Sequence, residues 1–356
     1  MEERYLSKLS PAVDYGAGAF LLLIAVLSVV GNISVLITAF KRSSNLKPPE
    51  LLSVNLAVTD LGMAITMYPL AIASAWNHGW LWGEPSCIYY GFMGFFFGIA
   101  SMMVLTVMAL IRFIVSTSLQ SPKEKINKKK VYILIIFTWT YALVWAVFPL
   151  LGWGKYGPEP FGISCTIAWS EFQESGSSFL ISMFTLCTIV PIVTIIGCYF
   201  GIARNLHVAY KSIENSNHVH NAVKAERRLV GIAVLVSVGF IGCWAPYATV
   251  SFWSMFRASD SIPPEVSMLP CLFAKSSTAY NPFIYYIFSK TFRAEIKQLT
   301  CFCGRSRNLL NMTDRGSLRE SQTYVNMLKR PMDADKDKLP VNNHEAETKI
   351  QFIGCE

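Results

Sequence analysis

Seven long apolar segments constrain the fold of this 356-residue chain more than any other feature. About 20 consecutive apolar residues are needed to cross the hydrocarbon core of a bilayer as a helix. Buried helices of a large soluble protein would carry polar faces, which these segments lack. The sequence therefore predicts an all-α integral membrane protein, a seven-transmembrane helix bundle. The segments cover residues 16–40, 51–76, 87–111, 131–151, 177–203, 229–256 and 266–288.

The basic residues gather in alternate loops, and this distribution decides what the net charge of +8 means. A basic chain can bind nucleic acid, but lysine and arginine in every second loop follow the positive-inside rule of membrane proteins. We therefore expect a multi-pass cell-membrane protein in the lipid bilayer, with an extracellular N-terminus, a cytoplasmic C-terminus and no nucleic-acid partner. The clustered residues are Lys41, Arg42, Lys47, Lys123, Lys125, Lys128, Lys129, Lys130, Lys224, Arg227, Arg228, Lys290, Arg293 and Lys297.

Lys275 is the only basic residue within the seven segments, and Asp60 is the only acidic one. Placing an ammonium group in the middle of a bilayer costs roughly 2.5–3.5 kcal/mol on insertion scales, so an intramembrane lysine indicates a functional site. A primary amine can condense with an aldehyde to form an imine, whose protonation its surroundings then control. We therefore predict that Lys275 is the attachment point of a covalent ligand.

The polar ends of the chain suggest three parts. Residues 1–15 are predicted to be an extracellular N-terminus, and residues 16–300 the membrane domain. This domain ends in a short amphipathic cytoplasmic helix over residues 289–299. Residues 301–356 are polar and predicted to be a disordered tail. Cys301 and Cys303 follow the amphipathic helix, where cysteines are frequently lipidated.

Cys87 and Cys165 are the two cysteines that the predicted topology places at or near the outer side of the membrane. Cys87 opens the third segment, and Cys165 lies in the 152–176 loop. Disulfides form in such an oxidising compartment, so we expect these two residues to pair and tie the loop to the helix. Two unpaired thiols are the alternative.

Polar and proline landmarks occur in a fixed order along the segments, and together they resemble the rhodopsin-class G-protein-coupled receptors. The resemblance covers about residues 15–300. Lys275, six residues before Asn281, makes the chain similar to opsins. Two stretches, Pro158–Trp169 and Ala274–Pro282, are most similar to the neuropsin group of non-visual opsins. The landmarks are Asn32, Asp60, Arg112, Trp139, Pro191, CWAPY at Cys243–Tyr247 and NPFIY at Asn281–Tyr285.

The resemblance implies a light-sensing receptor and not an enzyme. Residues 16–300 would form a retinal-binding domain that holds 11-cis or all-trans retinal as a Schiff base on Lys275. A heterotrimeric G protein would bind at the cytoplasmic face, and arrestin and a receptor kinase would act through the tail. No metal site is expected.

A charged Schiff base needs an anion, and the resemblance assigns this counterion to Glu159. Vertebrate visual opsins carry a glutamate where this chain has Tyr90. Glu159, six residues before Cys165, matches the loop glutamate of other opsins, which favours a bistable pigment. An exposed loop glutamate is the alternative. Asp60 is the competing counterion, although the resemblance places it in a polar network with Asn32 and Asn281.

Aromatic residues are expected to line the ligand site. Trp244 and Tyr247 flank Pro246, which removes a backbone hydrogen bond and kinks the sixth helix. Tyr90 is a further candidate, with Phe97, Phe184 and Phe240 as weaker ones. UV-sensing neuropsins carry a lysine where this chain has Tyr68. Tyrosine lacks the positive charge that would disfavour a protonated Schiff base, so we expect visible absorption.

The signalling switch departs from the family pattern at one position. Relatives carry an acidic residue before the arginine that corresponds to Arg112, whereas Ile111 precedes it here. Glu226 is the remaining candidate partner for Arg112. Tyr199, Pro282 and Tyr285 are expected to take part when the sixth helix moves.

The same residues can be compared with two other functions, a photoisomerase and an ion pump. The missing acid supports an alternative function as a retinal photoisomerase, or a retinal-handling opsin with weak or altered G-protein coupling. A light-driven ion pump would need carboxylates along the third segment, and none is present there.

Overall fold

The structure of the protein is a computed structural model that describes residues 2–117, 126–169, 177–212, 217–254 and 263–298. The described residues belong to one compact unit, Met1–Gln298. The predicted disordered tail, with Cys301 and Cys303, lies outside the described residues, and so does the side chain of Glu226.

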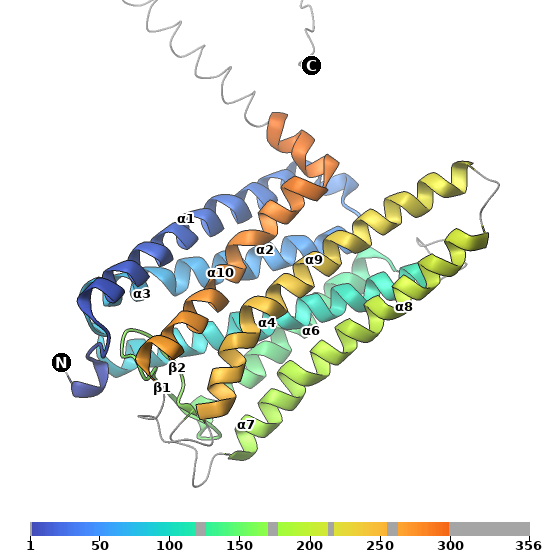
Figure 1. Cartoon of the computed structure of the whole chain (residues 1–356). Coiled ribbons are helices and arrows are strands. Elements are labelled where there is room, and N and C mark those ends of the chain that lie inside the picture. Colours follow the sequence, from blue (N-terminus) through green and yellow to red (C-terminus); the bar gives the residue numbers. More distant parts are fainter. Residues whose placement is uncertain (1, 118–125, 170–176, 213–216, 255–262, 299–356) are drawn as a thin grey trace, which may run out of the picture. The chain divides into compact units, whose positions relative to one another are not determined.

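Helices account for most of the described chain and correspond one by one to the seven apolar segments (Figure 1). The second span consists of two helices, and the fifth contains a π-helical turn. The spans are α1 (Pro11–Lys41), α2 with α3 (Pro48–Thr66, Tyr68–Trp76), α4 (Gly83–Thr117), α6 with the 3-10 turn η3 (Lys128–Val147, Phe148–Leu151), α7 with η5 and α8 (Ser177–Met183, Phe184–Ile189, Val190–Ser212), α9 (Asn217–Ser254) and α10 (Pro264–Phe288). Residues 290–298 form a further short helix, and 3-10 turns lie at Glu3–Tyr5 (η1) and Ser43–Asn45 (η2).

Six of the described spans are long and apolar enough to cross a membrane. The exception is α10, where Lys275, Asn281 and two prolines lower the apolarity. Its 25 residues still reach about 37 Å at the rise of an α-helix, more than the thickness of the hydrocarbon core. The predicted seven-transmembrane bundle is confirmed.

The first span is longer than its apolar segment, because α1 begins at Pro11. Proline suits the first turn of a helix, where its missing N–H has no partner to lose. Asp14 in this turn is fully buried. Its carboxylate accepts a hydrogen bond from Ser7 Oγ at 2.9 Å and lies 3.0 Å from His78 Nδ1. Apolarity alone could not reveal this polar turn as part of the helix.

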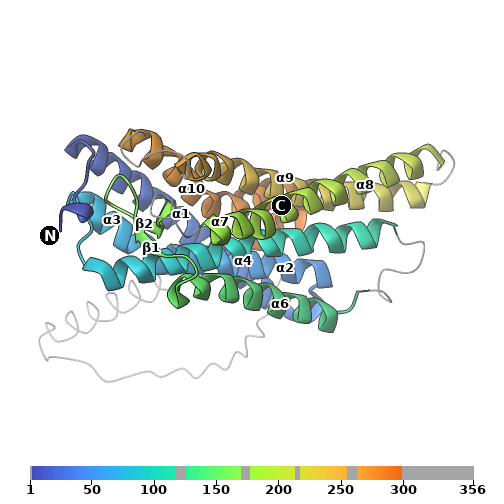
Figure 2. The same cartoon turned by 90° about the horizontal axis from the view of Figure 1, so that it is seen from below.

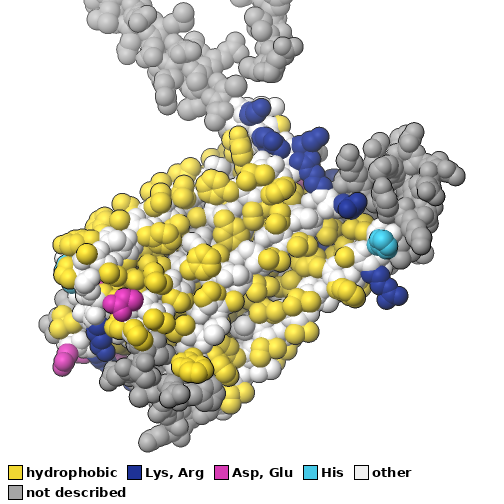
Figure 3. All heavy atoms as spheres, in the orientation of Figure 1, with side chains coloured by type: hydrophobic (Ala, Val, Ile, Leu, Met, Phe, Trp, Pro, Cys, Tyr) yellow, Lys and Arg dark blue, Asp and Glu magenta, His cyan; other side chains and the backbone are white. Residues whose placement is uncertain are grey.

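The helices pack around α4, which contacts α2, α6, α8 and α9 (Figure 2). The seventh span, α10, packs against both α9 and α1. Most lysine and arginine side chains on the face shown in Figure 3 gather at one end of the bundle, as the alternating basic loops predict. The opposite end carries the only sheet of the described residues, an antiparallel pair of β1 (Tyr156–Pro158) and β2 (Cys165–Ile167).

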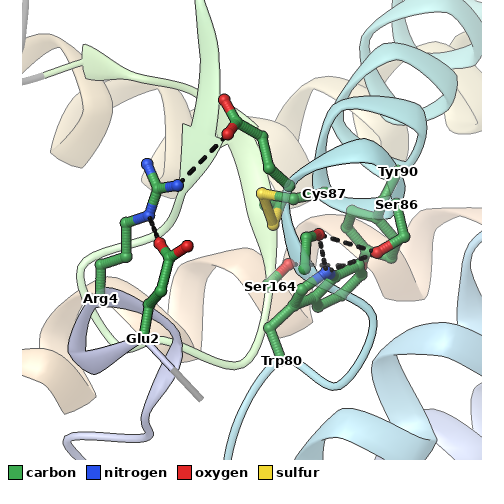
Figure 4. The surroundings of a disulfide bond; sticks show 10 residues. Glu2, Arg4, Trp80, Ser86, Cys87, Tyr90 and Ser164 are labelled. Atoms are coloured by element: carbon green, nitrogen blue, oxygen red, sulfur yellow. Dashed lines mark hydrogen bonds and ion pairs between the residues drawn. A yellow bond between two sulfur atoms is a disulfide. The ribbon is translucent and has the colours of Figure 1, made fainter.

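A disulfide between Cys87 and Cys165 ties this hairpin to α4, with an S–S distance of 2.07 Å. The predicted pairing is confirmed. Figure 4 shows its surroundings, where Trp80 Nε1 donates to Ser86 Oγ at 2.9 Å. The indole also packs edge-on against Tyr90, with ring centroids 5.0 Å apart. The disulfide therefore places the hairpin next to the N-terminal end of α4.

The segment before α1 covers the hairpin and the loop after α3. The Trp80 N–H donates to the Tyr5 carbonyl at 2.8 Å, and the Ser7 N–H donates to the His78 carbonyl at 2.9 Å. The Lys8 N–H reaches the Phe161 carbonyl at 3.3 Å. These bonds join three segments that are distant in the sequence into one outer layer.

Gly162 is required where this layer meets the hairpin loop. Its φ is +87°, and a Cβ atom there would lie 2.1 Å from the Leu6 carbonyl oxygen. A strained backbone alone costs about 1–3 kcal/mol. We expect Gly162→Ala to destabilise the protein by more than this, because the added Cβ also meets the Leu6 carbonyl. The measurement is the melting temperature of the purified protein. Gly152→Ala is the matched control, because Gly152 has a φ of +91° and open space around it. Equal losses in both variants would contradict the role of the Leu6 contact.

Candidate functional site

A cavity of about 140 Å³, the outer cavity, lies between the spans next to the β1–β2 hairpin and brings the predicted ligand-site residues together. Lys275, Glu159, Tyr90, Trp244 and Tyr247 all line it. Most of the other lining residues are apolar or aromatic, as is usual for pockets that bind small molecules. The weaker candidates Phe184 and Phe240 also line the cavity.

Phe97, the remaining weaker candidate, is not among the lining residues. Its ring lies against α2 and α6 instead. A Cβ on Gly62 would come within 2.5 Å of the Phe97 ring, and the Trp139 ring centroid is 6.1 Å away. Gly62 in the second span leaves the space that Phe97 fills.

Lys275 lies on α10 with only 8% of its surface exposed. Its Nζ atom is 2.7 Å from the Sγ atom of Cys271, one helical turn earlier, and 5.8 Å from the centre of the Tyr90 ring. The Tyr68 hydroxyl, which is fully buried, donates to the backbone carbonyl of Lys275 at 2.7 Å. The amine therefore sits in a cavity with a thiol and an aromatic face as neighbours.

Glu159 follows β1 and is buried, with 5% of its surface exposed. The Tyr247 hydroxyl donates to its carboxylate at 2.6 Å, and the same hydroxyl lies 3.0 Å from Thr166 Oγ1. Burial raises the pKa of the Glu159 carboxyl to about 6, against the opposing effects of the Tyr247 hydrogen bond and the positive charge of Lys275. The exposed loop glutamate, which was the alternative, does not describe this side chain.

Trp244 forms the inner wall of the cavity. Its ring stacks on Phe240, with centroids 5.6 Å apart, and its Nε1 donates to Ser277 Oγ on α10 at 3.1 Å. A Cβ on Gly98 of α4 would lie 3.3 Å from the indole, so glycine allows a close approach. Trp244 on α9 thus contacts two other spans, α4 and α10, and movement of its ring would affect both of them.

Asp60 is buried elsewhere and does not line the cavity. Asn281 Nδ2 donates to its carboxylate at 2.8 Å. Among the described contacts, Asn32 does not bond to Asp60. The Asn32 Nδ2 donates to the Thr278 carbonyl at 2.9 Å instead. The expected polar network therefore consists of two parts, which meet on α10.

The residues of the predicted signalling switch lie toward the end of the bundle opposite the β1–β2 hairpin. Arg112 and Tyr285 line a second cavity of about 120 Å³. Tyr199 is not among its lining residues, and its hydroxyl lies 3.2 Å from Ser237 Oγ on α9. Pro282 packs against α1, where a Cβ on Gly31 would come within 2.8 Å of its ring.

Four contributions to the outer cavity were missed by sequence analysis. Their chemistry was visible in the sequence, but their position depends on which way each helix or strand faces. For Tyr68, the sequence indicates only that the positive charge of a lysine is absent at this position. The missed contributions are the Cys271 thiol, the Tyr68 hydroxyl, Thr166 and Ser277.

Comparisons with known proteins agree with this arrangement. The family model of the 7 transmembrane receptor (rhodopsin family) matches residues 31–285. Opsin-5 of Mus musculus is 38% identical over 294 residues, covering 82% of this chain and 78% of its own length. The peropsin of the same species, a visual pigment-like receptor, is 31% identical, with 77% of this chain and 81% of its own length covered.

A solved structure shows the same fold. The crystal structure of squid rhodopsin superimposes with a TM-score of 0.76 at 27% sequence identity, covering 85% of this chain and 90% of that protein. The match to the family model runs from the last part of α1 into α10 and includes Lys275. The chain therefore belongs to the rhodopsin family of seven-transmembrane receptors and, within it, to the opsins, with Opsin-5 among its relatives.

Proposed function

We propose that the protein is a light-sensing, non-visual G-protein-coupled receptor that holds retinal covalently through Lys275. The observation that carries this proposal is the burial of one amine, Lys275, and one carboxylate, Glu159, on the same aromatic cavity. An amine with a carboxylate on the same cavity fits an aldehyde, which becomes a cation when it forms a protonated imine with the amine. Retinal supplies the absorption of light and a change of shape on isomerisation.

The residues around the Lys275 amine contribute to ligand binding in different ways. Lys275 provides the attachment point, and Glu159 provides the negative charge that a buried cation requires. Tyr247 holds the Glu159 carboxylate in place through its hydroxyl, and Thr166 Oγ1 lies against the same hydroxyl. Tyr68 holds the backbone of α10 at Lys275.

Trp244 connects the cavity to the cytoplasmic end. It lies two residues before Pro246, which interrupts the hydrogen bonding of α9. A ligand whose shape favours another position of the indole would shift the population between two packings of α9 and α10. Opening of the second cavity, with Arg112 and Tyr285, would then create the surface for a heterotrimeric G protein. Arrestin and a receptor kinase would act on the cytoplasmic tail, and the N-terminus would face outward.

A counterion on the loop rather than on α4 favours a bistable pigment, which a second photon can return to its starting state. We assign this role to Glu159. The test of signalling measures light-dependent nucleotide exchange on G proteins in parallel with the release of isomerised retinal. Nucleotide exchange without release of isomerised retinal supports the function as a receptor.

The alternative function is a retinal photoisomerase, and one residue favours it. Ile111 stands where an acidic residue would hold Arg112 in the inactive receptor, and its side chain is buried. Release of isomerised retinal without nucleotide exchange, in the experiment above, would support this function instead.

Ile111→Glu is expected to lower the activity of the receptor in the dark. A carboxylate next to Arg112 would stabilise the inactive packing, because an ion pair that is partly shielded from water is stronger than one in bulk water. The measurement is nucleotide exchange in the dark and in the light, with Ile111→Gln as the uncharged control. Equal dark activity in all three proteins would contradict the expectation.

A further inference from the structure

We propose that Cys271 and Lys275 form an oxidation-sensitive modification site, in which a peroxide joins the thiol to the amine through a covalent S–N bond. The Nζ and Sγ atoms are 2.7 Å apart, one helical turn from each other on α10. Both side chains are more than nine-tenths buried. Both also line the outer cavity, so a small oxidant that enters the cavity reaches the pair directly.

The other free cysteines of the described chain have different neighbours. Cys187 Sγ lies 3.8 Å from the Tyr141 hydroxyl, and Cys243 Sγ lies 3.9 Å from the Ser276 hydroxyl. Neither partner is an amine. Cys198 is buried and does not line the outer cavity. The amine–thiol contact therefore distinguishes Cys271 from the rest.

The first step is oxidation of sulfur. A protonated Lys275, 2.7 Å from the sulfur, favours the thiolate, which is the form that attacks a peroxide. The sulfur takes one oxygen atom from the peroxide and becomes a sulfenic acid. The alkoxide or hydroxide that is released takes a proton from Lys275, so the peroxide ends as an alcohol, or as water if it is hydrogen peroxide, and the amine becomes neutral.

The second step is condensation with the amine. The lone pair of the Lys275 nitrogen attacks sulfur, the S–O bond breaks, and the hydroxyl leaves as water with one proton from nitrogen. The product is a sulfenamide, Cys271 Sγ–Nζ Lys275, that has lost two hydrogen atoms relative to the reduced pair. Two equivalents of an external thiol reverse the reaction, restoring the thiol and the amine while forming one disulfide.

Proximity decides between this cross-link and further oxidation of sulfur. Well-placed groups in one molecule react with effective concentrations of about 10⁵–10⁸ M. A second molecule of peroxide at millimolar concentration cannot compete with an amine already in contact. The sulfenic acid should therefore be trapped before it reaches the irreversible sulfinic state.

The consequence of the cross-link rests on the proposed function. It consumes the amine that would bind retinal, so an oxidised receptor cannot be loaded with ligand until a thiol reduces it. The chemistry of the pair itself needs no ligand and can be tested on the ligand-free chain.

The test treats the purified ligand-free full-length receptor with hydrogen peroxide and maps its peptides by mass spectrometry. We expect the peptide that contains both Cys271 and Lys275 to become two hydrogen atoms lighter in about half of the chains or more, and to remain one piece when the chain is cut between the two residues. A reducing thiol should restore the original mass. Cys271→Ser should abolish the product, and Cys198→Ser, which changes a buried cysteine away from the cavity, should not.

A second measurement distinguishes failure of the modification site from failure of the proposed retinal-binding function. Aliquots before and after peroxide are incubated with retinal, and covalently held retinal is counted after denaturation. A drop of about twofold or more in wild type, but not in Cys271→Ser, agrees with the proposal. If neither untreated protein takes up retinal, the proposed function fails while the mass test still stands. A Cys271 found as sulfinic acid with Lys275 unmodified overturns the modification site.

Discussion

Lys275→Gly is expected to abolish every light-absorbing band that depends on covalently bound retinal. Among the described residues no other lysine lines the outer cavity, so no other amine found there can replace it. The measurement is the absorption spectrum of purified protein after incubation with 11-cis or all-trans retinal. Loss of the band is expected to be complete, because the bond itself is removed.

The control for folding uses the same variant. Glycine leaves the volume of the lysine side chain empty, so a preformed imine of retinal with a short alkylamine can enter. We expect Lys275→Gly with this imine to recover a band without a covalent link. A variant that keeps covalently bound retinal through another residue would contradict the assignment of Lys275.

Glu159→Gln is expected to shift the absorption of the bound pigment strongly toward the ultraviolet at neutral pH. Removing one partner of a buried ion pair costs about 3–5 kcal/mol, and here the cost falls on the protonated form of the ligand. Asp60→Asn is the matched variant, because Asp60 is buried but lies outside the cavity. A band that stays in place in Glu159→Gln but shifts in Asp60→Asn would make Asp60 the counterion.

The ligand-free protein provides a test of Glu159 that needs no retinal. Burial raises the pKa of this carboxyl to about 6, so the group is ionised above this pH and takes up a proton as the pH falls through it. We expect an infrared carboxylic acid band in wild type that appears below about pH 6. This titration step should be absent from Glu159→Gln, and its persistence would show that another carboxyl titrates.

Most of the fold was accessible from the sequence because a bilayer imposes a simple rule. Spanning segments must be long, apolar and helical, so apolar length identifies them. The rule fails where polar groups are satisfied internally. The first turn of α1 is an example, because Asp14 is buried against Ser7 and His78 and carries no apolar signal.

The candidate site was accessible only in part. Lys275 stood out as a lone charge, and the resemblance to opsins supplied Glu159, Trp244 and Tyr247. The contact between Cys271 and Lys275 depends on side-chain conformations on α10. The bond from Tyr247 to Glu159 depends on how the disulfide-tethered loop folds inward. Such tertiary details have no periodic signature in a single sequence.

The most direct test of the account is one spectrum of the protein with retinal, recorded before and after illumination. We expect a band that shifts on illumination and returns when the photoproduct is illuminated at its own maximum. The retinal should remain covalently attached on denaturation. A folded protein that forms no covalent adduct with either 11-cis or all-trans retinal would contradict it.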